Sequence, residues 1–372
     1  MLTAIVSDLH LGIATGADVA RLPAVRDRLV AALEGADRVL LLGDVLELRE
    51  RPLAEALDHC RPLFASLGEA LEGGHVTIVP GNHDYQLAEP WLSRGRLEGR
   101  PLAPAAEWPV APGDGPAGRL AEWMPRTEVT LAYPGLWLRD GVYATHGHYL
   151  DVALSVPRLE SIAASAMARL SGRHEGCRSP DDYEAVLAPL YSFFFSLTQG
   201  SQRTLRRGGR LSRTVWAAAN DGAGSRLGRV LLGRMTIPGA VALLNLAGIG
   251  PFRPDTSGPE LRRSGLRAMA EVLDGLGVDA EHVIFGHTHR PGPLPDDDEA
   301  EWSASGGARL WNTGSWLHEP VFLRRGPVES PYWPGTVLRL GDEGPPELAN
   351  ALRGVALEPN PSPSPGWVRR RR

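Results

Sequence analysis

Five short motifs built from metal-ligating residue types run along the chain, and each follows a segment with the pattern of a buried strand. They are Asp8-Leu9-His10, Gly43-Asp44, Gly81-Asn82-His83-Asp84, His146-Gly147-His148 and Gly286-His287-Thr288-His289. Open α/β folds bind their ligands at the carboxyl ends of strands, so five such strand ends can bring these side chains together. Asp, Asn and His side chains suit Mn, Fe, Zn or Mg ions. The sequence therefore predicts an α/β fold with a two-metal hydrolytic site at one edge of a sheet.

Strand and helix patterns alternate through the first part of the chain. Strands are predicted at residues 3–7, Val39–Leu42 and Val76–Val79, and amphipathic helices at Val19–Leu33 and Leu53–Leu71. This alternation indicates β-α-β units and a layered α/β architecture. Right-handed crossovers bring the ends of neighbouring strands, and hence the motifs, to one edge.

The rest of the chain divides by its pattern. Residues 99–125 are rich in Pro, Gly and Ala, which predicts an irregular surface excursion. Shorter strands of a second sheet are predicted at Glu128–Leu131, Leu136–Leu138 and Val142–Thr145. Three later segments restore the strand pattern, namely Val283–Phe285, Arg309–Asn312 and Thr336–Leu340.

A long helical segment separates these two groups of strands. Helices are predicted at Leu159–Leu170, Ala185–Leu197 and Arg226–Leu246. We therefore expect a core of residues 1–150 and 281–345, and a helical insertion, a lid or cap, at residues 151–280. The Pro- and Ser-rich stretch 357–372, which ends in an Arg run, is expected to be a disordered tail.

Composition excludes several classes of function. All basic residues are Arg, so no mechanism can use a Schiff-base or P-loop lysine. The net charge of −5 gives no general basic field for nucleic acid, and no nucleic acid is expected as a partner.

Cys60 and Cys177 are too few for a disulfide framework, which fits a reducing compartment. The first residues lack the pattern of a signal peptide, so we expect a cytoplasmic protein.

Together the five motifs resemble the calcineurin-like metallophosphoesterase superfamily, whose pattern is D-x-H, G-D, G-N-H-D/E, H and G-H-x-H. The likeness covers about residues 1–148 and 281–340, and it implies a four-layer α/β/β/α sandwich. It also implies that two divalent ions are bound and share one carboxylate. The ligands of the first ion would be Asp8, His10, Asp44 and His289, and those of the second Asp44, Asn82, His146 and His287.

The chemistry follows from the two ions that the resemblance implies. Two cations can clamp the attacking and leaving oxygens of an in-line phosphoryl displacement, and they make hydroxide available near neutral pH. The expected reaction is hydrolysis of a phosphate mono-, di- or pyrophosphate ester by metal-bound hydroxide, with Mn as the expected metal and Fe, Zn or Mg as alternatives. His83, next to Asn82, is expected to protonate the leaving oxygen or stabilise the transition state.

Three residues in or near the motifs have less specific expectations. Asp84 either orients His83 or caps the next turn. Glu47 is expected to support the site rather than to bind metal. His148 either touches the substrate or makes a structural hydrogen bond.

The insertion offers candidate substrate contacts. Its basic cluster could bind a second phosphate through guanidinium forks, although a solvated run of charge is the simpler reading. The cluster comprises Arg203, Arg206, Arg207, Arg210 and Arg213. The apolar segment Ile237–Ile249 predicts a buried helix, or alternatively an acyl-chain groove or a contact with a membrane surface.

Three motifs also resemble UDP-2,3-diacylglucosamine pyrophosphohydrolases, which carry a helical lid for acyl chains. The likeness lies in Ser7–Leu11, Gly43–Glu47 and Gly286–Pro291, whereas His83 stands where that family typically has Arg. It implies a substrate that is possibly lipid-linked and a possible peripheral membrane contact.

Two further functions remain as alternatives. Asp8-Leu9-His10-Leu11-Gly12 also resembles DNA-repair nucleases, but the acidic balance and the lack of a basic groove argue against that class. A non-catalytic metal-binding scaffold of the same fold is the other alternative. It is disfavoured because His83 and every motif residue are present.

Overall fold

The computed structural model describes residues 1–173, 176–200, 237–246, 249–253, 255, 257–320, 323 and 330–357. Its larger sheet has seven strands in the order β11-β10-β1-β2-β3-β5-β4. Strands β1, β2, β3 and β5 are parallel neighbours, and β4, β10 and β11 pair antiparallel with their neighbours. The strands are β1 Thr3–Val6, β2 Arg38–Leu41, β3 His75–Ile78, β4 Ala106–Pro109, β5 Glu128–Tyr133, β10 Thr336–Leu340 and β11 Glu347–Asn350.

A second sheet has four strands in the order β6-β7-β8-β9. Strands β7, β8 and β9 are parallel, and β6 is antiparallel to β7. They are β6 Gly135–Arg139, β7 Val142–Thr145, β8 His282–Phe285 and β9 Arg309–Asn312.

The two sheets pack face to face, and helices cover their outer faces. Ile5 and Leu40 of the first sheet join Ala144 and Ile284 of the second in one buried cluster between the sheets. Strand residues alternate between faces, so Val6, one position after Ile5, is buried on the helix-covered side instead. The result is the four-layer α/β/β/α sandwich that the family resemblance implies.

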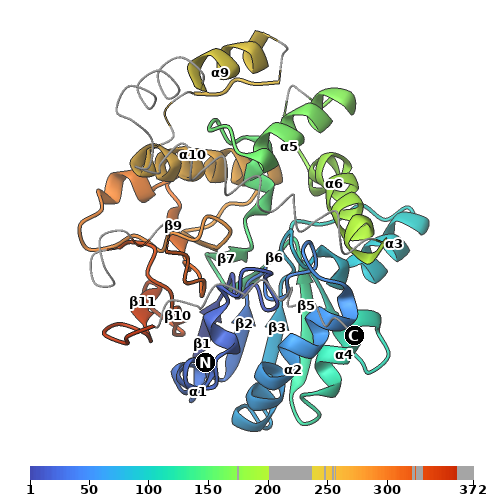
Figure 1. The fold of residues 1–372 in the computed structure, drawn as a ribbon, viewed down its shortest axis with the longest axis vertical. Helices are drawn as coiled ribbons and strands as arrows, with labels where there is room; N and C mark the ends of the chain where they lie inside the picture. The colour runs from blue at the N-terminus through green and yellow to red at the C-terminus, as the bar shows by residue number, and fades with distance from the viewer. Residues whose placement is uncertain are drawn as a thin grey trace, which may run out of the picture.

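The outer layers are formed by helices that lie on opposite sides of the sheets (Figure 1). Helices α1 (Pro23–Leu33), α2 (Leu53–Ala70) and α4 (Gly115–Glu122) cover the first sheet. Helix α10 (Gly258–Leu276) covers the second sheet, where Met269 is buried near Phe285. Although α10 lies within residues 151–280, it forms one of the four layers of the core.

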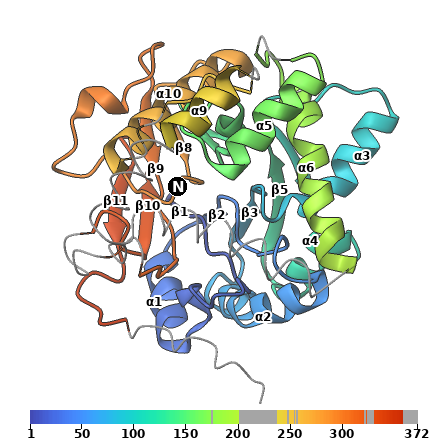
Figure 2. The same cartoon turned by 45° about the horizontal axis from the view of Figure 1, so that its top comes forward.

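The remaining helices lie beside the core. Helices α5 and α6 run next to each other and both contact η3 (Figure 2). The bounds are α3 Glu89–Leu97, α5 Leu159–Leu170, α6 Pro180–Gly200, α9 Ile237–Leu246, η1 Val19–Arg21, η2 Tyr85–Leu87, η3 His148–Val152 and η5 Glu299–Trp302. Among the described residues no helix is long and apolar enough to cross a membrane.

Two expectations for residues 99–133 were wrong. Residues 99–125 contain an edge strand, β4, and a helix, α4, rather than only irregular backbone. Strand β5 belongs to the first sheet, where it pairs in parallel with β3, and not to the second. A four-residue amphipathic pattern predicts a strand but cannot distinguish between two sheets that both bury one face against the same interior.

Some expectations fall outside the described residues. These are the cluster Arg203, Arg206, Arg207, Arg210 and Arg213, the helix start at residues 226–236, and residues 358–372 of the expected tail.

Candidate metal centre

The predicted metal-site residues follow the carboxyl ends of strands from both sheets. Asp8 and His10 follow β1, Asp44 follows β2, and Asn82 and His83 follow β3. From the second sheet, His146 follows β7, whereas His287 and His289 follow β8. Backbone hydrogen bonds tie adjacent strand ends together, because the Asp8 amide donates to Gly43 O at 3.0 Å and the His10 amide to Asp44 O at 2.8 Å.

The backbone of these loops is unusual. Among the described residues, the non-glycine positions with positive φ all belong to the predicted ligand set. Their φ values are 54° at Asp8, 43° at His10, 51° at Asp44, 65° at His287 and 61° at His289. Left-handed backbone is costly for residues with a Cβ atom, and it is typically found at functional sites, where the surrounding structure imposes it.

A first group of ligand atoms comes from Asp8, His10 and His289. His289 Nε2 lies 3.2 Å from Asp8 Oδ1, and His10 Nε2 lies 3.2 Å from His289 Nε2 and 3.9 Å from Asp8 Oδ1. His10 Nε2 is also 3.7 Å from Asp44 Oδ2, which connects this group to the next.

A second group comes from Asp44, His146 and His287. Their candidate ligand atoms lie within 4.8 Å of one another, and His146 Nε2 is 3.3 Å from Asp44 Oδ2. One terminal atom of the Asn82 amide lies 3.1 Å from Asp44 Oδ2 and 3.2 Å from His287 Nδ1. If this atom is the carbonyl oxygen, three acceptors meet there, which is the arrangement that a cation requires. Asp44 therefore lies between the two groups.

Three of the histidines have one ring nitrogen occupied by a fixed partner. His146 Nδ1 lies 2.9 Å from Leu42 O, and His10 Nδ1 lies 3.2 Å from Glu47 Oε2. His287 Nε2 lies 3.0 Å from Asp151 Oδ1. A proton on each of these nitrogens satisfies the contact, and the opposite nitrogen of each ring faces the centre, where it could bind a metal ion.

The buried polar atoms of the centre fit divalent cations. Asp8 Oδ1 and His146 Nε2 are fully buried and have no hydrogen-bond partner among the described residues. Buried polar atoms are nearly always satisfied in proteins, so two such atoms pointing into one ligand cluster need another partner. Carboxylate, amide and imidazole donors together suit Mn, Fe, Zn or Mg.

Electrostatics in the metal-free centre reflect the crowding of carboxylates and imidazoles. Burial lowers the pKa of His10 and His146, but the nearby carboxylates outweigh it and raise the pKa to about 9 for His10 and about 10 for His146. Burial raises the pKa of Asp44, whereas His146 and other neighbouring histidines lower it well below its usual range. Asp44 is therefore an ionised carboxylate at neutral pH.

Glu47 joins the centre to His83. Its Oε2 atom lies 2.7 Å from His83 Nδ1 as well as 3.2 Å from His10 Nδ1, and its side chain is buried. This agrees with the expected supporting role of Glu47. The contact fixes the orientation of His83, whose Nε2 atom points away from Glu47.

Asp84 and His148 have structural roles. Asp84 neither caps the following turn nor bonds to His83; it accepts hydrogen bonds from the backbone amides of Gly81, Asp44, Val45 and Leu46. It thereby joins the loop after β2 to the loop after β3. His148 is buried and its Nε2 atom lies 3.1 Å from the Tyr133 hydroxyl, so of the two expectations the structural hydrogen bond holds.

Two motif glycines are required by close packing. A Cβ atom on Gly81 would lie 2.3 Å from Asp44 Oδ1, and one on Gly43 would lie 2.2 Å from His146 Nδ1. These contacts are far shorter than van der Waals distances. The glycines therefore allow the ligand side chains to approach the neighbouring loops.

Sequence reasoning missed two residues at this centre. Asp151 lies in η3 and contacts His287, and Arg49 lies after β2 with Nη1 3.3 Å from His83 Nε2. Neither belongs to a motif, and their partners are distant in the sequence. The one available signal was that Arg49 lies close behind Gly43-Asp44, within reach of the same edge.

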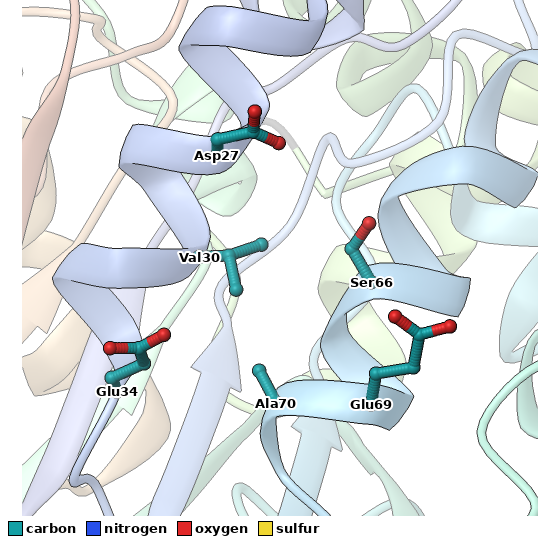
Figure 3. A pocket seen from close by; sticks show the side chains of 6 residues that line it. All are labelled: Asp27, Val30, Glu34, Ser66, Glu69 and Ala70. Atoms are coloured by element: carbon teal, nitrogen blue, oxygen red, sulfur yellow. The ribbon is translucent and has the colours of Figure 1, made fainter.

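A shallow groove elsewhere on the surface is separate from the centre. It lies between α1 and α2 (Figure 3) and is lined by Asp27, Val30, Glu34, Ser66, Glu69 and Ala70. Helix α1 ends just before β2 begins, so this groove lies toward the amino edge of the sheet, opposite the ligand loops.

Comparison with known proteins identifies the family. Residues 1–199, more than half of the chain, match the sequence model described as calcineurin-like phosphoesterase. Comparison with curated proteins gives no match.

Two solved structures show weak overall similarity. One is a dimetal phosphatase from Danio rerio, with 15% identity, a TM-score of 0.34, and coverage of 94% of this chain and 99% of that chain. The other is a mutant cold-active protein tyrosine phosphatase, with 13% identity, a TM-score of 0.30, and coverage of 92% and 75%. At these scores neither adds to the assignment, which rests on the family match. The chain belongs to the calcineurin-like phosphoesterase family and is a phosphoric ester hydrolase.

Proposed function

We propose that the protein is a binuclear metal-dependent phosphoesterase that hydrolyses a phosphate mono-, di- or pyrophosphate ester. One observation carries the proposal: two groups of candidate ligand atoms meet at the carboxyl edge of the sheets, where Asp44 belongs to the second group and its Oδ2 atom lies 3.7 Å from His10 Nε2 of the first. A shared carboxylate between two cation positions is the arrangement that two-metal hydrolysis uses.

Seven residues would hold the two ions. The first ion takes Asp8, His10, Asp44 and His289, and the second takes Asp44, Asn82, His146 and His287. When bound, such ions supply Lewis-acid stabilisation of phosphoryl oxygens and activate a water molecule. Asp151, Leu42 and Glu47 hold the imidazole rings in the required tautomers.

His83 would act on the leaving group. Glu47 accepts from its Nδ1 atom at 2.7 Å, which leaves Nε2 as the atom that can deliver a proton to the leaving oxygen. The leaving alcohol or phosphate then departs neutral or less charged.

The finer features of the function belong to this proposal as well. Manganese suits the mixed carboxylate, amide and imidazole ligands. A lipid-linked substrate and a peripheral membrane contact are supported by α9, which is apolar and exposes Leu246. A cytoplasmic location is supported by the free cysteines Cys60 and Cys177.

Steady-state kinetics on three ester classes tests the proposal. Protein reconstituted with Mn should be compared on p-nitrophenyl phosphate, bis-p-nitrophenyl phosphate and a nucleotide-linked diacyl sugar pyrophosphate, by kcat/KM. We expect metal-dependent hydrolysis of at least one class, abolished by a chelator and restored by Mn. Preference for the lipid would make the helical insertion an acyl-binding lid, and preference for a water-soluble ester would exclude that role.

The same preparation separates the alternatives. Cleavage of linear duplex DNA with Mn would favour a nuclease, whereas absence of cleavage discards it. Stoichiometric metal without turnover of any ester would contradict the proposal and favour a non-catalytic scaffold.

A further inference from the structure

Arg49 is a cation directed into the candidate centre from the loop after β2. Its side chain is only 14% exposed, and Nη1 lies 3.3 Å from His83 Nε2. Arg49 Nη1 also lies 2.9 Å from one terminal atom of the Asn82 amide, the one that faces away from Asp44 and His287. Arg49 therefore contacts both the proposed general acid and a proposed ligand of the second ion.

Helices α5 and α6 hold Arg49 in this place. Glu160 of α5 lies 3.6 Å from Nη2, and the ring of Phe194 of α6 lies 4.6 Å below the guanidinium. The Thr198 hydroxyl of α6 donates to the Arg49 carbonyl at 2.8 Å. Two helices of the expected insertion thus fix the backbone, the plane and the charge of one arginine.

The orientation of the Asn82 amide determines whether it offers Arg49 a hydrogen-bond acceptor. If Asn82 binds metal, its carbonyl oxygen must face Asp44 and His287, and its amide nitrogen then faces Arg49 Nη1 at 2.9 Å. Two donors at that distance repel each other, so the acceptor that remains for Nη1 is His83 Nε2 at 3.3 Å, and Nη1 loses it when Nε2 carries the proton for the leaving oxygen. Glu160, at 3.6 Å, lies beyond direct hydrogen-bond distance and engages the opposite nitrogen.

Phosphate is the acceptor that fits this place. A guanidinium fork matches two phosphate oxygens, and it is more weakly hydrated than an ammonium, which favours such a pair in a largely buried site. An ester undergoing hydrolysis at the centre must place its phosphoryl group beside His83, and therefore beside Arg49.

We propose that Arg49 binds a non-bridging oxygen of the substrate phosphate, and that α5 and α6 position it for this contact. The inference rests on the proposed function and extends it, because it makes the insertion part of the substrate site. Arg49 touches substrate in this account, whereas Phe194 acts through Arg49 as a positioning residue.

Substitution of Arg49 tests the contact with phosphate. In Mn-loaded Arg49→Gln, we expect KM for p-nitrophenyl phosphate and the inhibition constant of inorganic phosphate to rise roughly 10- to 100-fold, as for loss of a charged hydrogen bond. Arg49→Lys should recover part of the loss, since it keeps the charge without the fork. Bound Mn should stay at the wild-type level in both variants.

The matched control is Arg126→Gln. Arg126 is an exposed arginine that pairs with Glu72, and its side chain is 71% exposed. Both kinetic constants should equal those of the wild type. An unchanged inhibition constant for phosphate in Arg49→Gln, or a loss of Mn in both Arg49→Gln and Arg49→Lys, would overturn the proposal.

A double-mutant cycle tests the role of α6. Phe194→Leu removes the ring below the guanidinium and should raise the phosphate inhibition constant about 3- to 10-fold. In Arg49→Gln the same change should have no further effect, because its influence passes through Arg49. Additive effects would refute the positioning role.

Direct binding separates this inference from the proposed function. Calorimetric titration of inorganic phosphate into Mn-loaded protein needs no turnover. If the wild-type protein hydrolyses no ester, the proposed function fails. Weaker phosphate binding by Arg49→Gln would still support the Arg49 contact, and equal binding would refute it.

Discussion

At the scale of single residues, four imidazoles of the centre are oriented by partners outside the ligand set. His10 and His83 share Glu47, His146 has the Leu42 carbonyl, and His287 has Asp151. Such partners fix the tautomer and raise ligand basicity, so they matter nearly as much as the ligands.

Asp151→Asn should weaken one metal site selectively. We expect the affinity of the site formed by Asn82, His146 and His287 to fall roughly 10- to 100-fold, because the His287 ring loses its anionic partner. Titration of metal-free protein with Mn measures both sites. Asp27→Asn, in the groove between α1 and α2, is the control and should leave both affinities unchanged. Equal affinities in Asp151→Asn and the wild type would show that Asp151 does not support the centre.

His83→Ala should separate chemistry from metal binding. Loss of a general acid lowers turnover by about two to four orders of magnitude, whereas the seven ligand positions remain intact. The measurements are kcat on p-nitrophenyl phosphate and bound Mn by elemental analysis. His75→Ala, at the opposite end of β3, should keep wild-type turnover. A parallel loss of bound Mn in His83→Ala would refute the catalytic role.

At the scale of elements, α6 is attached to the core by a buried carboxylate. Glu184 accepts hydrogen bonds from the hydroxyls of Tyr85 at 2.8 Å, Tyr133 at 2.6 Å and Tyr149 at 2.7 Å. These tyrosines come from η2, β5 and η3. One side chain thus fixes the helix that carries Phe194 and Thr198 beside Arg49.

Glu184→Ala should destabilise the fold. Buried hydroxyls that lose their acceptor cost about 1–3 kcal/mol each, so we expect the free energy of unfolding to fall by about 3 kcal/mol. Urea denaturation measures it. Glu98→Ala, at a half-exposed position on the surface, should change it by less than about 0.5 kcal/mol. A change that small in Glu184→Ala would mean that the tyrosines find other acceptors.

The sequence predicted the elements whose residues identify them locally. Strands β1, β2, β3, β7 and β8 have short apolar runs followed by a ligand motif, so both their existence and the place of the ligands could be read directly. Strands β9 and β10 and helix α5 were predicted with the same bounds.

Strand β4 and helix α10 were not predicted from the sequence, for different reasons. Strand β4 is a half-exposed edge strand with Pro109 at its end, and among the described strands it pairs with β5 alone. Helix α10 has a sequence signal at each end, because Ser257 is an N-cap residue and Gly277, which has φ 65° in the structure, follows its last residue. We did not predict this helix because the signals lie within the long helical segment.

The candidate site also contains residues that local sequence identifies and residues that only tertiary packing places there. Its motif residues are local, and the structure brings them together. Asp151 is 136 residues from His287, and Thr198 is 149 residues from Arg49. Contacts over such distances depend on tertiary packing, which one sequence does not reveal. The positive φ values of the ligand residues are likewise imposed by the fold, because no local pattern demands them.

At the scale of the whole molecule, metal binding should depend on pH. In the metal-free protein the pKa is about 9 for His10 and about 10 for His146, so both rings carry an extra proton at neutral pH. Metal must displace these protons, so affinity should rise with pH and level off above about pH 9–10. Calorimetry at pH 7.5 in buffers of different ionisation enthalpy should show about one proton released by each ring. Metal binding without proton release would contradict this account of the charges.

The central claim is that two ions share Asp44, and metal stoichiometry with turnover tests it most directly. After dialysis against Mn, wild-type protein should hold two ions per chain and hydrolyse p-nitrophenyl or bis-p-nitrophenyl phosphate. Asp44→Asn should lose or weaken both ions together and lose turnover. Retention of one full-affinity ion in Asp44→Asn, or hydrolysis by fully metal-free wild-type protein, would contradict the account.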